Sequence, residues 1–334
     1  MVSMKDIANR CGVSVATVSK ALSGQPDVGA ETRNEIKRIA DSLGYLPTAA
    51  ARALKTRRSY NLGILFVDEQ SSGLTHAFFS SLLDSFKVGA ESGGYDVTFI
   101  NRNVGLRPTT YLQHCRYRGL DGAVIACVDF TDPQVQELLA SDFPVVTIDY
   151  AFRGTSVMSD NESGVGQLVR YASSLGHRKI AYIHGEISPV TQARLQSFYQ
   201  ACAELGIESR DGYVRLGEYQ NPYKCYEITK QLLALPDRPT CIIFPDDLSY
   251  IGGMNAILEA GLSIPGDISV MGYDGIKLTS FISPKLTTWV QDTDTIGAEA
   301  ARKLIELVED PEAPSTVVTV PGKLFRGESV AKIE

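Results

Sequence analysis

The chain lacks the features that mark secreted and membrane proteins. It has no apolar run long enough to cross a membrane, and its amino terminus carries Lys5 and Asp6 where a secretion signal would have an apolar core. Its six cysteines include no CxxC pair, so we expect reduced thiols and not a disulfide framework or a zinc site. These absences predict a cytoplasmic protein.

Signatures of catalysis are scarce as well. The chain contains no GxxxxGK phosphate-binding loop and no HExxH metal-binding pair, and its four histidines are not spaced as metal ligands. The sequence therefore predicts no catalytic residues, no metal and no other cofactor. An enzyme on the same scaffold is the weaker alternative.

What is present is a long chain with unevenly distributed charge. Its 334 residues, 44% hydrophobic and 21% charged, are enough for two or three domains with their own cores. The net charge is −7, but residues 1–60 hold ten Lys and Arg against five Asp and Glu, whereas the remainder holds 22 against 34. A basic amino-terminal part on an acidic body indicates that the amino-terminal part binds nucleic acid.

The first 22 residues have the pattern of a helix-turn-helix. Gly12 is placed to end a first helix, and Ser14 is placed to cap a second. On the second helix three apolar residues share the side that packs: Val18, Ala21 and Leu22. The opposite side, which is free to read DNA, holds Val15, Ala16, Ser19 and Lys20. A third helix is expected between Thr32 and Gly44.

Residues 47–60 form a basic, alanine-rich segment. After Pro47 the chain can form only one or two helical turns, which would become ordered only against a partner. Arg52 and Lys55 are among the positive charges that suit phosphate groups. Leu54 has no obvious core to join. Two such leucines from a dimer would wedge into a minor-groove base step, or Leu54 simply touches the next domain.

From Leu62 onward, apolar runs alternate with segments long enough for helices. The runs are LGILFVD, YDVTFI, DGAVIAC, PVVTID, KIAYIHG, TCIIFP and ISVMGY. This alternation predicts parallel sheets covered by helices on both faces, and about 270 residues favour two sheets over one. A ligand of such a body binds at the carboxyl ends of the strands.

Four charged residues stand near those strand ends. Asp149, Asp246 and Asp274 each follow a predicted strand, and Arg194 lies on the helix after KIAYIHG. Singly, each carboxylate has an ordinary explanation as a turn or strand-end residue, and Asp247 is expected to cap a helix that begins at Leu248. Together, an arginine and several carboxylates offer donors and acceptors that suit neighbouring hydroxyls. The set predicts a polyol site.

Several motifs spread along the chain occur together in one known family. They are MKDIANRCGVSVATVSKALS, GYLPTAAARALKTRRSYNLGIL, HAFFSSLL, TIDY, SDNESG, LGHRKIAYIHG, ARLQSF, IPGDISVMGYDG, LTTWVQD and LFRGES. With them the chain resembles the lactose-repressor (LacI/GalR) family of bacterial transcription regulators. The resemblance implies an α/β protein: an all-α helix-turn-helix headpiece (1–46), a hinge helix and linker (47–60), and a bilobed, periplasmic-binding-protein-like body with two parallel sheets (61–334).

The resemblance also implies roles for individual residues. Those that face bases would be Val15, Ala16 and Lys20, and those nearer the phosphates would be Ser14, Thr17 and Ser19. Leu54 would be the hinge-helix wedge. The aromatic residues that line the effector cleft would be Phe78, Phe79 and Tyr219; the alternative is that they are core aromatics, above all Phe79, which has apolar neighbours. Arginine is common in relatives at the position of Lys20, and a lysine cannot make the rigid two-pronged contact to guanine.

The expected function follows from this resemblance. The protein would be a homodimeric repressor that binds double-stranded operator DNA under control of a small effector, a sugar or sugar phosphate. The alternative is a regulator of the same class that responds to a purine or nucleoside corepressor. Its body would divide into lobe N (about 61–160 and 291–321) and lobe C (about 161–290 and 322–334). No leucine heptads follow LFRGES, so a tetramer is not expected.

Overall fold

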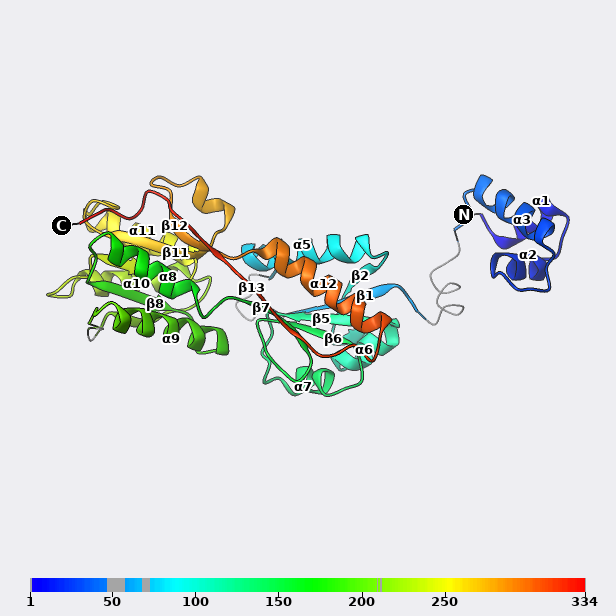
Figure 1. Cartoon of the computed structure of the whole chain (residues 1–334), viewed down its shortest axis with the longest axis horizontal. Helices are drawn as coiled ribbons and strands as arrows, with labels where there is room; N and C mark the ends of the chain where they lie inside the picture. The colour runs from blue at the N-terminus through cyan, green and yellow to red at the C-terminus, as the bar shows by residue number, and fades with distance from the viewer. Residues whose placement is uncertain (1, 47–57, 68–72, 209, 211, 334) are drawn as a thin grey trace. The chain divides into compact units, whose positions relative to one another are not determined.

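The computed structural model describes residues 2–46, 58–67, 73–208, 210 and 212–333. The chain forms two compact units, Met1–Asn61 and Leu62–Glu334 (Figure 1). None of the described helices is long and apolar enough to cross a membrane.

The amino-terminal unit is a bundle of three short helices. These are α1 (Met4–Cys11), α2 (Val15–Leu22) and α3 (Ala30–Ser42). Ser3 and Asp6 cap the start of α1 reciprocally, and Gly12 ends that helix at a φ of 66°. Ile7, Val18 and Ile36 are fully buried at the centre of the bundle. The three helices predicted from capping and periodicity are confirmed.

Lobe N of the body is built on the sheet β13-β7-β6-β5-β1-β2. Pairings among β1, β5, β6, β7 and β13 are all parallel. The strands are β1 (Asn61–Phe66), β2 (Asp96–Phe99), β5 (Gly122–Ala126), β6 (Val145–Ile148), β7 (Thr155–Ser159) and β13 (Val317–Val320). Helices α5 (Ala77–Ser92) and α12 (Thr293–Glu309) lie on one face, and α6 (Tyr111–Arg118) and α7 (Pro133–Leu139) lie on the other (Figure 1). Three short elements complete the lobe: η1 (Gly73–Thr75), β3 (Asn103–Val104) and β4 (Arg107–Pro108).

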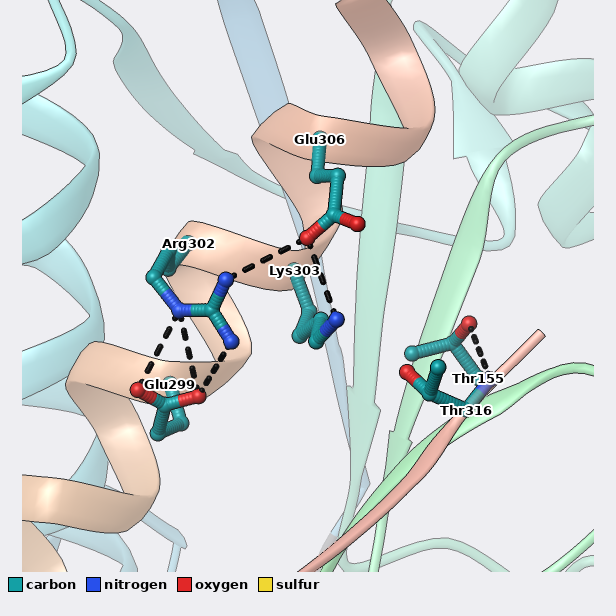
Figure 2. Close-up of polar contacts among 6 residues, drawn as sticks. All are labelled: Thr155, Glu299, Arg302, Lys303, Glu306 and Thr316. Carbon is teal, nitrogen blue, oxygen red and sulfur yellow. Dashed lines mark hydrogen bonds and ion pairs between the residues drawn. The ribbon is translucent and has the colours of Figure 1, made fainter. Parts of the chain in front are cut away.

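Helix α12 packs closely on α5 and carries ion pairs on its outer side. A Cβ at Gly297 would lie 2.4 Å from the carbonyl oxygen of Leu82, so only glycine allows this approach. On the outer side, Arg302 pairs with Glu299 at 2.7 Å and with Glu306 at 3.2 Å (Figure 2).

Two distant segments meet at the same edge of lobe N. The backbone N–H of Thr316 donates to the hydroxyl of Thr155 at 3.3 Å (Figure 2). Because β7 and β13 pair beside this contact, the two strands that lead towards the other lobe run next to each other.

Lobe C is built on a second sheet, β14-β12-β11-β10-β8-β9. Its strands are β8 (Ile180–His184), β9 (Val214–Leu216), β10 (Cys241–Ile243), β11 (Ser269–Asp274), β12 (Thr287–Val290) and β14 (Lys323–Phe325). Its helices are α8 (Gly164–Ser174), α9 (Pro189–Glu204), α10 (Pro222–Leu233), α11 (Asp247–Glu259) and η2 (Lys277–Ser280). One apolar core joins the sheet to α8 and α9, and a second joins it to α10 and α11.

The two predicted sheets are confirmed, with one departure from parallel order. Strand β14 pairs antiparallel with β12 at the edge of lobe C, whereas the other pairings described in that sheet are parallel. The chain passes between the sheets three times, after Ser159, Val290 and Val320. These crossings connect the lobes by three separate segments.

Candidate functional site

The second helix of the amino-terminal unit turns one side to solvent. Val18 and Ala21 are fully buried, so α2 packs through the predicted side. At its start, the hydroxyl of Ser14 accepts a hydrogen bond from the backbone N–H of Thr17 at 3.0 Å. The candidate base-reading side chains are exposed: Val15, Ala16 and Lys20. Of the candidates for phosphate contact, Ser14 is exposed, whereas Thr17 and Ser19 are half-buried.

Lys20 has an acidic neighbour that sequence reasoning missed. Its Nζ lies 2.5 Å from Oδ2 of Asp27, and the two side chains are 54% and 52% exposed. Arg33 holds the loop that carries Asp27, because it donates to the carbonyls of Gln25 and Val28 at 2.8 Å each. The hydrogen bond from Lys20 lowers the pKa of Asp27. The positive charge assigned to base reading is therefore offset locally.

The remaining candidates for DNA contact lie outside the described residues. These are Arg52, Leu54 and Lys55. Their assignment continues to rest on the sequence.

In the body, Asp149 follows β6 at the carboxyl edge of the lobe N sheet. Its backbone has a φ of 54°, in the left-handed region. The carboxylate accepts hydrogen bonds from Ser159, from the backbone N–H at 2.6 Å and from the hydroxyl at 3.0 Å. Burial raises the pKa of Asp149. The hydrogen bonds to its carboxylate and the charge of Arg194 lower the pKa, but burial has the larger effect. This aspartate is thus a structural partner of β7 as well as a candidate ligand contact.

Arg194 is the buried cation of lobe C. It lies on α9 and is 4% exposed. Its guanidinium carbon sits 3.7 Å from the ring centre of Tyr273 and 5.7 Å from that of Tyr219. Burial by itself lowers the pKa of Arg194, but the two phenols and Asp274 raise it beyond its usual value. The guanidinium is therefore permanently charged.

Asn161 connects these two charged groups across the lobes. Its Oδ1 accepts from Nε of Arg194 at 2.9 Å, and its Nδ2 lies 3.4 Å from Oδ1 of Asp149. Asn161 is buried, on the segment that leads from β7 into α8. Any movement of one lobe against the other must change this Asp149–Asn161–Arg194 chain. From the sequence, Asn161 was noted only as part of the motif SDNESG and was assigned no role.

Asp274 ends β11 and is the least satisfied of the candidate carboxylates. It is 8% exposed and has a φ of 105°. Its Oδ1 accepts from Nε2 of Gln291 at 2.7 Å, and no described residue donates to its Oδ2. Burial raises the pKa of Asp274 to about 7, against the charge of Arg194. Gln291 was not among the predicted site residues. It follows β12, and the pairing of β12 with β11 that brings it next to Asp274 cannot be read from the sequence.

Asp246 and Asp247 have structural partners. Asp246 caps α11 and accepts from Ser249 at 2.8 and 2.7 Å and from the N–H of Gln220 at 2.9 Å. Asp247 accepts from the N–H groups of residues 275 and 276 and from the hydroxyl of residue 288. Burial raises the pKa of both carboxyls. The expectation that Asp247 is the cap was wrong: the helix begins one residue earlier, and Asp246 is the cap.

The three candidate aromatic residues lie in two places. Phe78 is buried on α5, and Phe79 is half-buried beside it at a centroid distance of 5.0 Å, with His76 at 4.7 Å from Phe79. Tyr219 lies in lobe C, where its hydroxyl is 2.9 Å from that of Thr191. The two phenylalanines therefore form an aromatic cluster on lobe N, whereas Tyr219 flanks Arg194 in lobe C.

A cavity of about 370 Å³ opens beside these groups. Both lobes line it: Asp149, Tyr150, Ala151, Met158, Ser159, Asp160, Asn161, Glu162, Pro189, Val190, Ala193, Val317 and Thr319. Of the predicted effector residues only Asp149 is part of this lining, although Ala193 directly precedes Arg194. Three of the remaining lining residues come from the crossing segment after β7, and the others come from β7, β13, α9 and the loop after β6, which sequence periodicity could not bring together.

Family models match both parts of the chain. The model for bacterial regulatory proteins of the lacI family matches residues 3–48, and that for the periplasmic binding protein-like domain matches residues 169–330.

Relatives match over the whole length of the chain. The chain is 31% identical to the HTH-type transcriptional repressor PurR of Serratia proteamaculans (strain 568), over 99% of this chain and 97% of the relative. It is 28% identical to the probable HTH-type transcriptional repressor ExuR of Bacillus subtilis (strain 168), over 100% and 99%.

Solved structures of the same architecture also match. The lac repressor dimer bound to operator and the anti-inducer ONPF has a TM-score of 0.81 at 25% identity, over 99% of both chains. A LacI family regulator from Enterococcus faecium with bound ribose has a TM-score of 0.70 at 26% identity, over 82% of this chain and 100% of that one.

Proposed function

Because this chain belongs to the lacI family of bacterial regulatory proteins, we propose that it is a cytoplasmic homodimer that represses transcription under control of a small carbohydrate. Membership of this family makes it a DNA-binding transcription regulator and not an enzyme. The helix-turn-helix unit binds operator DNA, and the two-lobed body binds the effector.

On the DNA side, the exposed side of α2 supports the assignment of base contacts to Val15, Ala16 and Lys20. Phosphate contacts are assigned to the residues around them and to the basic hinge: Ser14, Thr17, Ser19, Arg52 and Lys55. Leu54 is assigned the minor-groove wedge. Replacing Leu54 with Ala should weaken specific operator binding in a titration of labelled DNA and leave effector binding intact. Operator affinity equal to that of the unaltered protein would argue against the wedge.

On the effector side, the proposal rests chiefly on the Asp149–Asn161–Arg194 chain beside the cavity. A ligand in this cavity contacts both lobes, so its binding free energy differs between lobe arrangements, which is the requirement for allosteric control. A volume of about 370 Å³ is within the range for small-molecule sites and suits one sugar ring. We assign direct or neighbouring roles in binding to Asp149, Arg194 and Asp274, and flanking roles to Phe78, Phe79, Tyr219 and Asp246.

A ligand screen tests the effector class. Sugars, purines and nucleosides are compared by thermal shift on the full chain, and hits are then added to an operator-binding titration. A sugar that raises Tm and changes operator affinity in either direction supports the proposal. A purine or nucleoside that does so in place of every sugar would replace it with the corepressor alternative.

A further inference from the structure

The loop that follows α2 brings a carboxylate into contact with the ammonium group of Lys20. Asp27 lies in this loop, residues 23–29, which joins α2 to α3. Its Oδ2 is 2.5 Å from Nζ of Lys20, and both side chains are about half exposed. Among the described residues, Lys20 is the one whose side chain donates to this carboxylate. The exposed side of α2 therefore presents a donor and an acceptor next to each other.

The backbone of this loop is held independently of the ion pair. The N–H of Gln25 donates to the carbonyl of Lys20 at 3.0 Å, and Arg33 on α3 donates to the carbonyls of Gln25 and Val28. Val28 is buried and belongs to the apolar core of the three helices. The loop is thus tied to both neighbouring helices. We expect Asp27 to stay beside Lys20 when DNA binds, although an exposed ion pair holds only weakly by itself.

A carboxylate beside the lysine changes what the lysine can read. An ammonium group on a flexible stem suits many acceptors in the major groove: N7 and O6 of guanine, O4 of thymine and N7 of adenine. A neighbouring carboxylate accepts from base amino groups and is repelled by base acceptors. The hydrogen bond from Lys20 lowers the pKa of Asp27, so the carboxylate is ionised at neutral pH. Its effect is therefore to penalise wrong base pairs.

The spacing of the two groups matches one edge of a base pair. In a G·C pair, O6 of guanine and the N4 amino group of cytosine are joined by a hydrogen bond of about 2.9 Å. Nζ of Lys20 and Oδ2 of Asp27 are also one hydrogen bond apart. With Nζ at O6, the carboxylate is close to N4. The pairs A·T and C·G offer an amino group to the lysine and an acceptor to the carboxylate, so both contacts fail.

We propose that Asp27 is a specificity-determining residue of operator recognition: Lys20 and Asp27 together read one G·C base pair, Lys20 donating to guanine and Asp27 accepting from the N4 amino group of the paired cytosine. This inference rests on the proposed base contact of Lys20 and adds a second residue to it. Of the other three pairs, T·A is tolerated best, because it repeats the order of acceptor and amino group and lacks only N7.

The experiment first locates the base pair and then measures its selectivity. Random-oligonucleotide selection on the full chain gives the operator, and the same selection with Lys20→Met, which keeps an apolar stem and removes the charge, identifies the position that Lys20 reads. The Kd is then measured for operators with each of the four base pairs there. The unaltered protein should bind the A·T and C·G operators at least about tenfold more weakly than the G·C operator, and the T·A operator should lie between them.

Asp27→Ala should reduce this selectivity to about threefold or less, because the mismatched operators bind more tightly once the carboxylate is gone. Asp41→Ala removes the same charge from an exposed position on α3 and is the matched control, which should keep the full selectivity. Unchanged selectivity in Asp27→Ala, or a preferred pair other than G·C, would overturn this inference and leave the contact of Lys20 in place. If Lys20→Met selects the same operator as the unaltered protein, the proposed contact of Lys20 fails and this inference fails with it.

A modified base tests the accepting role of Asp27 directly. In N4-methylcytosine the methyl group replaces the amino hydrogen that faces the major groove, and the base still pairs with guanine. Placed at the identified position, it should weaken binding of the unaltered protein and of Asp41→Ala, and it should change binding of Asp27→Ala little. An equal loss in the unaltered protein and in Asp27→Ala would mean that Asp27 does not accept from cytosine.

Discussion

The helical DNA-binding unit and the two-lobed body place their charges in opposite environments. In the helical unit, Lys20 and Asp27 form a pair at the surface, above a core of apolar side chains. In the body, Arg194 and Asp274 are buried. A surface charge is screened by water and salt, whereas a buried charge leaves its partners uncompensated when it is removed. Substitutions in the cleft should therefore change stability and regulation strongly. Substitutions around the exposed side of α2 should change DNA affinity mildly.

The largest effect is expected for Arg194→Ala. It removes the one cation that is buried among the described residues, close to Asp149 and Asp274, and leaves Oδ1 of Asn161 without its donor. We expect a loss of about 3–5 kcal/mol in the free energy of unfolding, measured by urea denaturation, and loss of the effector response in operator titrations. Arg170→Ala, which removes an arginine from an exposed pair with Glu204, is the control and should change stability little. A near-normal effector response in Arg194→Ala would remove this residue from the site.

The pH dependence of stability tests the burial of Asp274. Its pKa of about 7 in the folded protein exceeds the value of about 3.9 in an unfolded chain, so between these values the folded state binds more protons. The stability that this proton uptake provides is complete below about pH 4 and is lost as the pH rises to about 7. The difference in pKa corresponds to about 4 kcal/mol.

Asp274→Asn should remove this contribution and make the curve of unfolding free energy against pH less steep between about 4 and 7; the raised pKa values of Asp149, Asp246 and Asp247 keep part of the slope. Asp142→Asn alters an exposed carboxylate and serves as the control. In the unaltered protein, effector affinity should rise as the pH increases through about 7, because the ionised carboxylate accepts hydrogen bonds from ligand hydroxyls. An affinity that is constant from pH 5 to 8 would mean that Asp274 does not accept from the ligand.

Asn161→Ala should separate effector binding from the response to it. The substitution removes the link between Arg194 and Asp149 but leaves both charged groups in place, so we expect a loss of about 1–3 kcal/mol in stability. The effector-induced change in operator affinity should decrease more than effector affinity measured by calorimetry. Equal decreases in the two quantities would mean that Asn161 only shapes the site.

Local features of the chain made much of the fold predictable. The cap at Ser14, the stop at Gly12 and the buried Val18 depend on neighbours within one or two helical turns, and all three were confirmed. The strands that were predicted from apolar runs were confirmed for the same reason. Five strands of the two lobe sheets were not among the predicted runs, β7, β9, β12, β13 and β14; each has five residues or fewer, which is too short for a clear periodicity.

The cleft was less predictable because its contacts join distant segments. Asn161, Arg194 and Asp149 meet only when two lobes and a crossing segment are assembled, and no periodicity encodes that meeting. The cap of α11 was misplaced by one residue because two adjacent aspartates are equally suited to it in sequence; the backbone decides that Asp246 is the cap. A single sequence thus indicates which residue types serve a site before it shows how they are linked.

The smallest effect is expected for Asp27→Asn, which changes the charge next to Lys20 on the exposed side of α2. Asn at this position cannot offset the charge of Lys20, so the surface around α2 gains about one net positive charge, which attracts DNA phosphates. Affinity for non-specific DNA should increase a few-fold at low salt, and the slope of log K against log salt concentration should steepen by about one. Asp41→Asn makes the same charge change on α3, without a lysine partner among the described ion pairs, and is the matched control. If both variants steepen the slope equally, the effect belongs to net charge and the pair with Lys20 has no separate role; if only Asp27→Asn does so, the local pairing sets how strongly the recognition helix is drawn to DNA.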